Sequence, residues 1–119
     1  MVLKYQEEVR RAMHYLAENE KTLFIGQTVE YGGSRFTKDL QSLPLMKRIE
    51  FPVAEELQMG FSIGLGLEGY IPVSIYPRFD FLLLATNQLV NHLDKFPILS
   101  NYQLNPKIIL RTIVGSKKP

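Results

Sequence analysis

The chain contains no cysteine, so disulfide bonds, thiolate catalysis and metal sites built on cysteine are excluded. It has only two histidines, His14 and His92, which are too few for a histidine-rich metal centre. No stretch approaches the roughly 18 consecutive apolar residues that a membrane-spanning helix needs. The N-terminal sequence is charged, follows a helical pattern and lacks the apolar core of a signal peptide. We therefore expect a cytoplasmic protein that does not enter a membrane.

The chain also has little excess of positive over negative charge. Fourteen Lys and Arg residues stand against twelve Asp and Glu residues, which leaves a net charge of +2. This surplus is too small and too scattered to indicate nucleic-acid binding. Lys117 and Lys118 form a basic cluster that is most simply a solvated tail. The length of 119 residues and the hydrophobic content of 45% are typical of one globular domain with one core.

Hydrophobic periodicity predicts helices that alternate with short buried strands. Strands are predicted where apolar runs are short, at residues 22–26, 47–51, 71–76 and 107–114. Helices are predicted at residues 3–19, 37–43 and 82–96, and from Pro52 or Val53 to Gly66. This alternation predicts an α/β fold with a parallel sheet.

The loop Tyr31-Gly32-Gly33-Ser34 has the backbone freedom of a turn. A glycine pair can also cradle a phosphate, but no helix-opening Gly-Lys-Ser/Thr follows it. We therefore favour the turn.

Glu55 is the strongest candidate for a chemical role, and the residues alone leave two interpretations open. It follows a predicted strand at the start of a predicted helix, where α/β proteins bind ligands. Glu55 and Glu56 both suit the positive end of the helix dipole, which is a structural role. Alternatively, a carboxylate surrounded by Phe51, Val53 and Phe81 could share a proton with a ligand nitrogen.

Several motifs occur in the order known from one protein family. They are Gly26-Gln27-Thr28-Val29-Glu30-Tyr31-Gly32-Gly33-Ser34-Arg35-Phe36, Phe51-Pro52-Val53-Ala54-Glu55, the glycines from Gly60 to Gly66, Gly69-Tyr70-Ile71-Pro72-Val73, Phe79-Asp80-Phe81 and Asn87-Gln88-Leu89-Val90-Asn91. In these motifs the chain resembles the pyrimidine-binding domain of thiamine-diphosphate enzymes. It is most similar to the N-terminal half of the beta subunit of the 2-oxo-acid dehydrogenase first component. The similarity covers nearly the whole chain.

The resemblance implies a three-layer sandwich with a mostly parallel sheet, and a role for four residues. Glu55 would hydrogen-bond the ring nitrogen N1′ of the aminopyrimidine and so help the cofactor lose the proton on its reactive carbon. Phe81 would stack on the pyrimidine; it follows Glu55 by 26 positions, as in the family. Val53 and Pro77 would line the same pocket. Phe79 is expected in the core. Phe81 has an alternative, purely structural interpretation as a core aromatic residue at the start of a helix.

The resemblance also implies a partner. In this family an alpha-type subunit holds the diphosphate and Mg²⁺, with Gly-Asp-Gly and Asn-Asn patterns that do not occur here. We expect a homo- or hetero-oligomer that is inactive without that subunit, and a C-terminal domain of the full subunit beyond this single domain of residues 1–119. Local departures from the family are Gln27, Glu50-Phe51 and Asn87-Gln88-Leu89.

Other functions remain open on the sequence. The chain could be a non-catalytic truncated module that mediates oligomerisation, because Gly60 and Gly64 share a helix face that allows close packing. It could also be the equivalent domain of a transketolase or deoxyxylulose-phosphate synthase. A flavodoxin-like nucleotide binder is least favoured, because the phosphate loop is missing. Pyruvate, branched-chain oxo acids and acetoin are distinguished largely by groups outside this segment.

Overall fold

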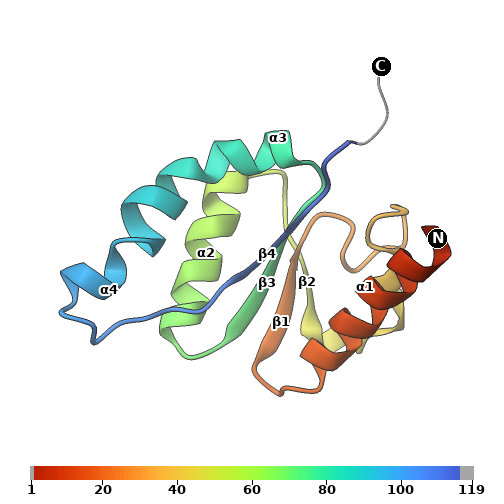
Figure 1. Cartoon of the computed structure of the whole chain (residues 1–119), viewed down its shortest axis with the longest axis horizontal. Coiled ribbons are helices and arrows are strands. Elements are labelled where there is room, and N and C mark those ends of the chain that lie inside the picture. Colours follow the sequence, from red (N-terminus) through yellow and green to blue (C-terminus); the bar gives the residue numbers. More distant parts are fainter. Residues whose placement is uncertain (1, 116–119) are drawn as a thin grey trace.

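The computed structural model describes residues 2–115 and contains a four-stranded sheet between two layers of helices (Figure 1). The strands are β1 (Thr22–Gly26), β2 (Arg48–Glu50), β3 (Ile71–Tyr76) and β4 (Ile109–Thr112). Their order is β2-β1-β3-β4, and every neighbouring pair is parallel. The expected α/β sandwich with a parallel sheet is confirmed. The expected Lys117-Lys118 tail lies outside the described residues.

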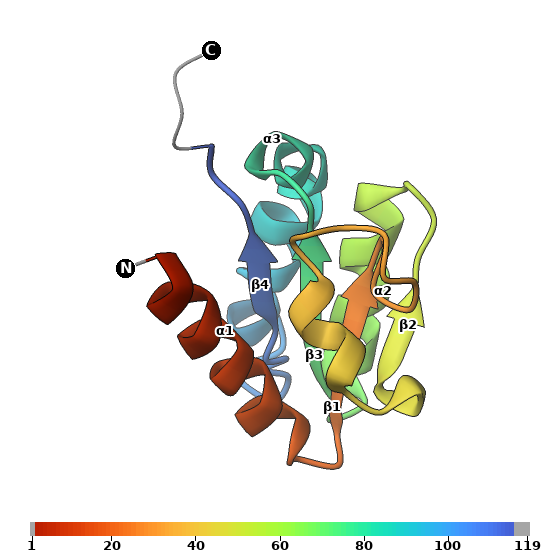
Figure 2. The same ribbon diagram turned by 90° about the vertical axis from the view of Figure 1, so that its right-hand side faces the viewer.

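Each face of the sheet has its own core. On one face lie α1 (Val2–Ala17) and a 3₁₀ segment, Lys38–Ser42, and on the other lies α2 (Glu55–Leu67) with the helical segments that follow β3 (Figures 1 and 2). The buried residues of the α1 side are Met13, Phe24, Val29, Leu40, Leu43, Val73 and Ile75. Those of the α2 side are Met59, Ile63, Tyr76, Leu82 and Ala85. Burial of these apolar side chains holds the layers together.

The start of α2 differs from the expected Pro52 or Val53. Its first helical residue is Glu55, and Ala54 before it has a non-helical backbone with φ −154° and ψ 78°. The side chain of Gln27 explains the delay, because its Nε2 donates to the carbonyl oxygens of Pro52 at 2.9 Å and Phe51 at 3.4 Å. These carbonyls are therefore not taken by helix amides, and Glu55 becomes the residue that opens the helix.

The prediction of one continuous helix at residues 82–96 is wrong. The chain instead forms α3 (Phe79–Leu82), a 3₁₀ segment at Leu83–Ala85, a π-helix at Gln88–Leu93 and α4 (Phe96–Leu99). Its apolar side still packs on α2, as the periodicity indicated. The prediction that Phe79 is in the core is also wrong, since 45% of it is exposed. The reason is that α2 packs mainly on residues 83–85 and 88–93, so α3 is left largely uncovered.

The last strand is shorter and less buried than the strand that we predicted at residues 107–114. Within the described residues β4 pairs only with β3, and Leu110 on it is 36% exposed. The loop before it packs tightly on the end of α2. A Cβ added to Gly66 would lie 2.9 Å from the Cβ of Pro106, so this close approach requires glycine.

Candidate functional site

The candidate site lies at the carboxyl edge of the parallel sheet. Glu55 opens α2 just after β2, while Pro77 and Phe81 follow β3 and belong to the β3–α3 connection and α3. Because all strands are parallel, these segments gather at one edge, which Figure 2 shows as the end that the arrowheads approach. The structure thus places Glu55 and Phe81 on neighbouring elements of one edge, as Figure 1 shows for α3 and the start of α2.

Glu55 is largely buried, with 8% of its surface exposed. Within residues 2–115 its carboxylate oxygens accept no hydrogen bond. The carboxylate sits in the first turn of α2, where the helix dipole favours a negative charge. Its neighbour Glu56 is exposed. Of the two adjacent carboxylates, Glu55 is therefore the buried one.

Tyr76, the last residue of β3, links the strand to this turn. Its hydroxyl accepts a hydrogen bond from Ser74 Oγ at 3.4 Å and donates to the backbone carbonyl of Glu55 at 3.5 Å. Burial raises the pKa of Tyr76 to about 12; the bond from Ser74 opposes this rise and the negative charge of Glu55 adds to it. Tyr76 therefore stays protonated at neutral pH.

Phe81 offers a partly exposed aromatic ring at the same edge, with 37% of the residue exposed. The guanidinium of Arg78 lies over this ring at 5.9 Å from its centre, within the range of a cation–π contact. One face of the ring is thus covered by a cation. A flat ligand would have to stack on the other face or displace Arg78.

The remaining predicted residues are less enclosed. Pro77 is half-buried, whereas Val53 is 80% exposed in the loop before α2. The ring of Phe51 packs against that of Phe61 on α2, with the ring centres 5.5 Å apart. The arrangement is open to solvent, and Val53 can line a pocket only if another surface covers it.

Comparison with curated proteins identifies relatives of this chain. The chain is 33% identical over 109 residues to the pyruvate dehydrogenase E1 component subunit beta of Gracilaria tenuistipitata var. liui, a match that covers 88% of this chain and 34% of that protein. It is 39% identical over 83 residues to the mitochondrial 2-oxoisovalerate dehydrogenase subunit beta of Chaetomium thermophilum, covering 68% of this chain and 18% of that protein. This chain belongs to the beta-subunit family of the 2-oxo-acid dehydrogenases.

A third member of the beta-subunit family extends the similarity to bacteria. The 3-methyl-2-oxobutanoate dehydrogenase subunit beta of Mycobacterium tuberculosis is 28% identical over 109 residues, which cover 88% of this chain and 31% of that protein. No protein-family model matches the chain. The chain spans a third or less of the length of these beta subunits.

Sequence reasoning missed a set of buried polar residues behind Glu55. Gln58, Ser62 and Ser74 are fully buried, and Gln58 Nε2 and Ser62 Oγ both donate to Ser74 Oγ at 3.1 Å. The signal that could have found them is a polar residue inside an apolar run, as at Ser74 in β3, and one at a core-facing position of α2, as at Gln58. Gln27 was noted only as a departure from the family.

Another carboxylate at this edge is structural. Glu50 accepts hydrogen bonds from the backbone amides of Thr28 at 2.7 Å and Glu30 at 2.9 Å. It thereby holds the start of the loop that contains Gly32 and Gly33. In that loop the amide of Gly33 donates to the carbonyl of Tyr31 at 2.7 Å, the geometry of a tight turn.

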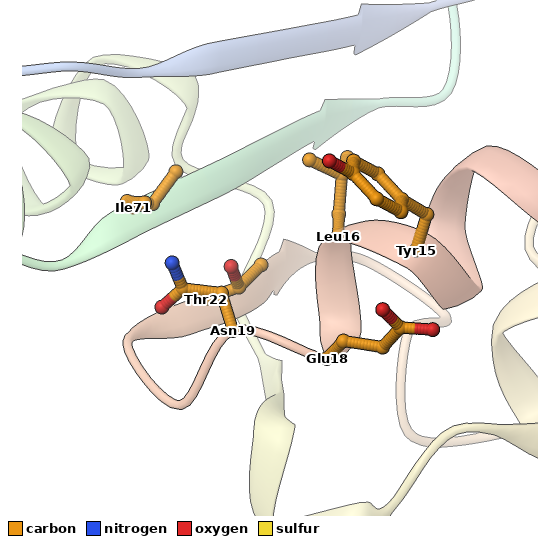
Figure 3. Close-up of a pocket in the computed structure, with 6 residues that line it drawn as sticks. All are labelled: Tyr15, Leu16, Glu18, Asn19, Thr22 and Ile71. Carbon is orange, nitrogen blue, oxygen red and sulfur yellow. The ribbon is translucent and has the colours of Figure 1, made fainter.

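A shallow depression among the described residues lies away from this edge of the sheet. It has a volume of about 340 Å³ and lies between the end of α1 and the starts of β1 and β3, at the amino edge of the sheet (Figure 3). It is lined by Tyr15, Leu16, Glu18, Asn19, Thr22 and Ile71.

Among residues 2–115 no group of three or more His, Asp or Glu side chains could hold a metal ion. No helix in the described part is long and apolar enough to cross a membrane.

Proposed function

We propose that this chain is the pyrimidine-binding half of a thiamine-diphosphate-dependent 2-oxo-acid dehydrogenase beta subunit. The observation that carries the proposal is the position of Glu55. It is a buried carboxylate without a hydrogen-bond donor among the described residues, at the carboxyl edge of a parallel sheet and at the start of a helix. The beta-subunit relatives support the same assignment.

The residues present fit the pyrimidine end of the cofactor. An unengaged carboxylate can accept from, or donate to, a ring nitrogen, and a partly exposed phenyl ring can stack on a flat heteroaromatic. When bound, thiamine diphosphate supplies the carbanion that attacks a 2-oxo acid. In this proposal Glu55 holds the proton at N1′, Phe81 orients the ring, and Pro77 and Val53 border it.

The diphosphate and Mg²⁺ would be held by an alpha-type subunit. The outer face of α2 supports association, because Leu57 is 61% exposed, Phe61 is 41% exposed, and Gly60 and Gly64 have open space around them in the described part of the chain. Contiguous exposed apolar surface of this kind marks protein interfaces. We expect the isolated chain to self-associate, and a monomer at high concentration in light scattering would contradict this.

The same exposed face keeps a second function in consideration, namely a non-catalytic module that only oligomerises. Equivalent domains of transketolase or deoxyxylulose-phosphate synthase type would share the Glu55 chemistry. The cytoplasmic location stays a prediction, and one relative carries a mitochondrial name.

The decisive experiment is Glu55→Gln in a complex reconstituted with an alpha-type subunit, thiamine diphosphate, Mg²⁺ and a 2-oxo acid. Loss of a proton-transfer group predicts a fall in kcat on the order of 100-fold. Glu56→Gln is the matched control, because Glu56 is the exposed neighbour on the same turn, and it should change kcat less than twofold. Unchanged activity of Glu55→Gln would show that Glu55 does not transfer the proton.

A further inference from the structure

Two glutamine side chains enclose the turn that carries Glu55. Gln27, in the loop after β1, points its Nε2 group at three acceptors. These are the carbonyl oxygens of Pro52 at 2.9 Å and Phe51 at 3.4 Å, and Oε1 of Gln58 at 2.9 Å. It therefore contacts the chain both before and after Glu55.

Gln58 follows Glu55 by three residues and is fully buried. Its Nε2 donates to the carbonyl oxygen of Ile75 at 3.0 Å, to Ser74 Oγ at 3.1 Å and to the carbonyl oxygen of Ile25 at 3.4 Å. Its side chain thus ties α2 to the ends of the two central strands, β1 and β3. Its Oε1 is left to accept from Gln27.

The donors and acceptors of the two glutamine side chains fit together in one arrangement. All acceptors around Gln58 Nε2 are strand oxygens or a hydroxyl, which orients the Gln58 amide with Oε1 toward Gln27. Position 27 then faces three oxygen atoms and needs a donor. A carboxylate there would place oxygen against oxygen three times, because an ionised carboxylate only accepts. A glutamine at position 27 supplies the donor that these three oxygen atoms need.

We propose that Gln27 and Gln58 are positioning residues that hold the first turn of α2, and with it the Glu55 side chain, in a fixed relation to the carboxyl ends of β1 and β3. A fully satisfied buried polar network specifies one geometry more sharply than apolar contacts do. The consequence for catalysis rests on the proposed function, whereas the geometric role of the pair does not.

The test uses two variants and one control in the whole chain. Gln58→Met keeps the shape of the side chain and removes its hydrogen bonds, and Gln27→Glu keeps its size and reverses its polarity. Gln103→Glu introduces the same charge at an exposed position in the loop before β4. Backbone amide exchange is measured by NMR at Gln58 and Met59, together with the carboxyl carbon signal of Glu55 in glutamate-labelled protein, assigned through Glu55→Gln.

We expect exchange at these two amides to rise at least tenfold in Gln58→Met and Gln27→Glu, with the Glu55 signal shifted and the Glu56 signal unmoved. Exchange in β1 and β3 should change less than threefold, and Gln103→Glu should match the parent chain. A uniform rise across the sheet would show that the pair only adds core stability, and would overturn the proposal. Unchanged exchange and an unmoved Glu55 signal would also overturn it.

A kinetic measurement then separates this proposal from the proposed function. In the reconstituted complex, Gln58→Met should lower kcat about tenfold and leave KM for the 2-oxo acid within twofold. If Glu55→Gln abolishes activity while Gln58→Met leaves kcat unchanged, the positioning role is wrong and the proposed function stands. If Glu55→Gln has no effect, the proposed function fails. The amide-exchange data alone then test whether Gln27 and Gln58 hold the first turn of α2 in place.

Discussion

The hydroxyl of Tyr76 lies 3.5 Å from the backbone carbonyl oxygen of Glu55, so the last residue of β3 contacts the first residue of α2. Parallel strands deliver their carboxyl ends to one edge, and a helix that starts there brings its first turn to the same place. The strand end thereby helps hold the backbone of the residue that opens the helix.

Tyr76 should make the protein lose stability at alkaline pH. Its pKa is about 12 in the folded chain against an ordinary value of 10. The stabilisation is therefore fully present below pH 10 and is lost as pH rises from 10 to 12, by roughly 3 kcal/mol for two pKa units. Chemical denaturation between pH 9 and 11.5 should show a shallower decline for Tyr76→Phe. Tyr70→Phe, at a 40% exposed position, should keep the parent slope; equal slopes for all three chains would contradict the assignment.

Gly64 and Gly66 should respond in opposite directions to alanine. A Cβ on Gly64 meets open space in the described part of the chain, so Gly64→Ala should stabilise α2 by about 0.5–1 kcal/mol through helix propensity. A Cβ on Gly66 would lie 2.9 Å from Pro106, so Gly66→Ala should destabilise by about 1–2 kcal/mol. Urea unfolding measures both. If Gly64→Ala were the more destabilising change, the packing of the loop at Pro106 on α2 would be wrong.

Gly64→Ala also tests the partner surface. The added methyl group should weaken association of the chain with a partner at least tenfold while the chain itself becomes more stable. Analytical ultracentrifugation of the parent and variant chains would show this. Association that is equally tight in both would place the interface elsewhere.

Arg111 and Asp39 should form the most valuable ion pair among the described residues. They make two hydrogen bonds, of 2.8 and 2.9 Å, with 12% and 14% of their side chains exposed, and Arg111 also lies over the ring of Phe36 at 4.7 Å. Asp39→Asn should cost about 3 kcal/mol, because the buried guanidinium loses its counter-charge. Arg11→Gln is the control, since its pair with Glu8 is exposed, and should cost less than about 1 kcal/mol. Similar losses of unfolding free energy in the two variants would refute this ranking.

Phe81 and Arg78 should differ in their effect on cofactor affinity. In the reconstituted complex, Phe81→Ala should weaken binding of thiamine diphosphate at least tenfold, because the stacking surface is removed. Arg78→Ala should change the affinity less than threefold if the ligand uses the ring face that Arg78 leaves free. Tryptophan is absent from the chain, so calorimetry is the suitable measurement. Unaltered affinity in Phe81→Ala would remove Phe81 from the site.

Local pattern was sufficient for the framework of the fold. The bounds of β1 and β3 were predicted to the residue, and α1 to within two residues, because short apolar runs and helical spacing report directly which face of each element is buried. The position of Glu55 after β2 and of Phe81 after β3 also follows from chain order. Whether these residues bind a cofactor stays a prediction, since it depends on a ligand and a partner.

The tertiary structure decided the burial of Glu55 and the hydrogen bonds around the turn that carries it. Gln27 and Gln58 are 31 residues apart, and Asp39 and Arg111 are 72 apart, yet each pair is joined by hydrogen bonds. Periodicity predicts that a side chain is buried but not which polar group it meets across space. The delayed start of α2 and the interruptions in residues 79–99 have the same origin, because contacts with distant segments override the local helical pattern. By itself the sequence determined the order, type and apolar faces of the elements; their packing determined where each begins and which polar side chains hold the candidate site.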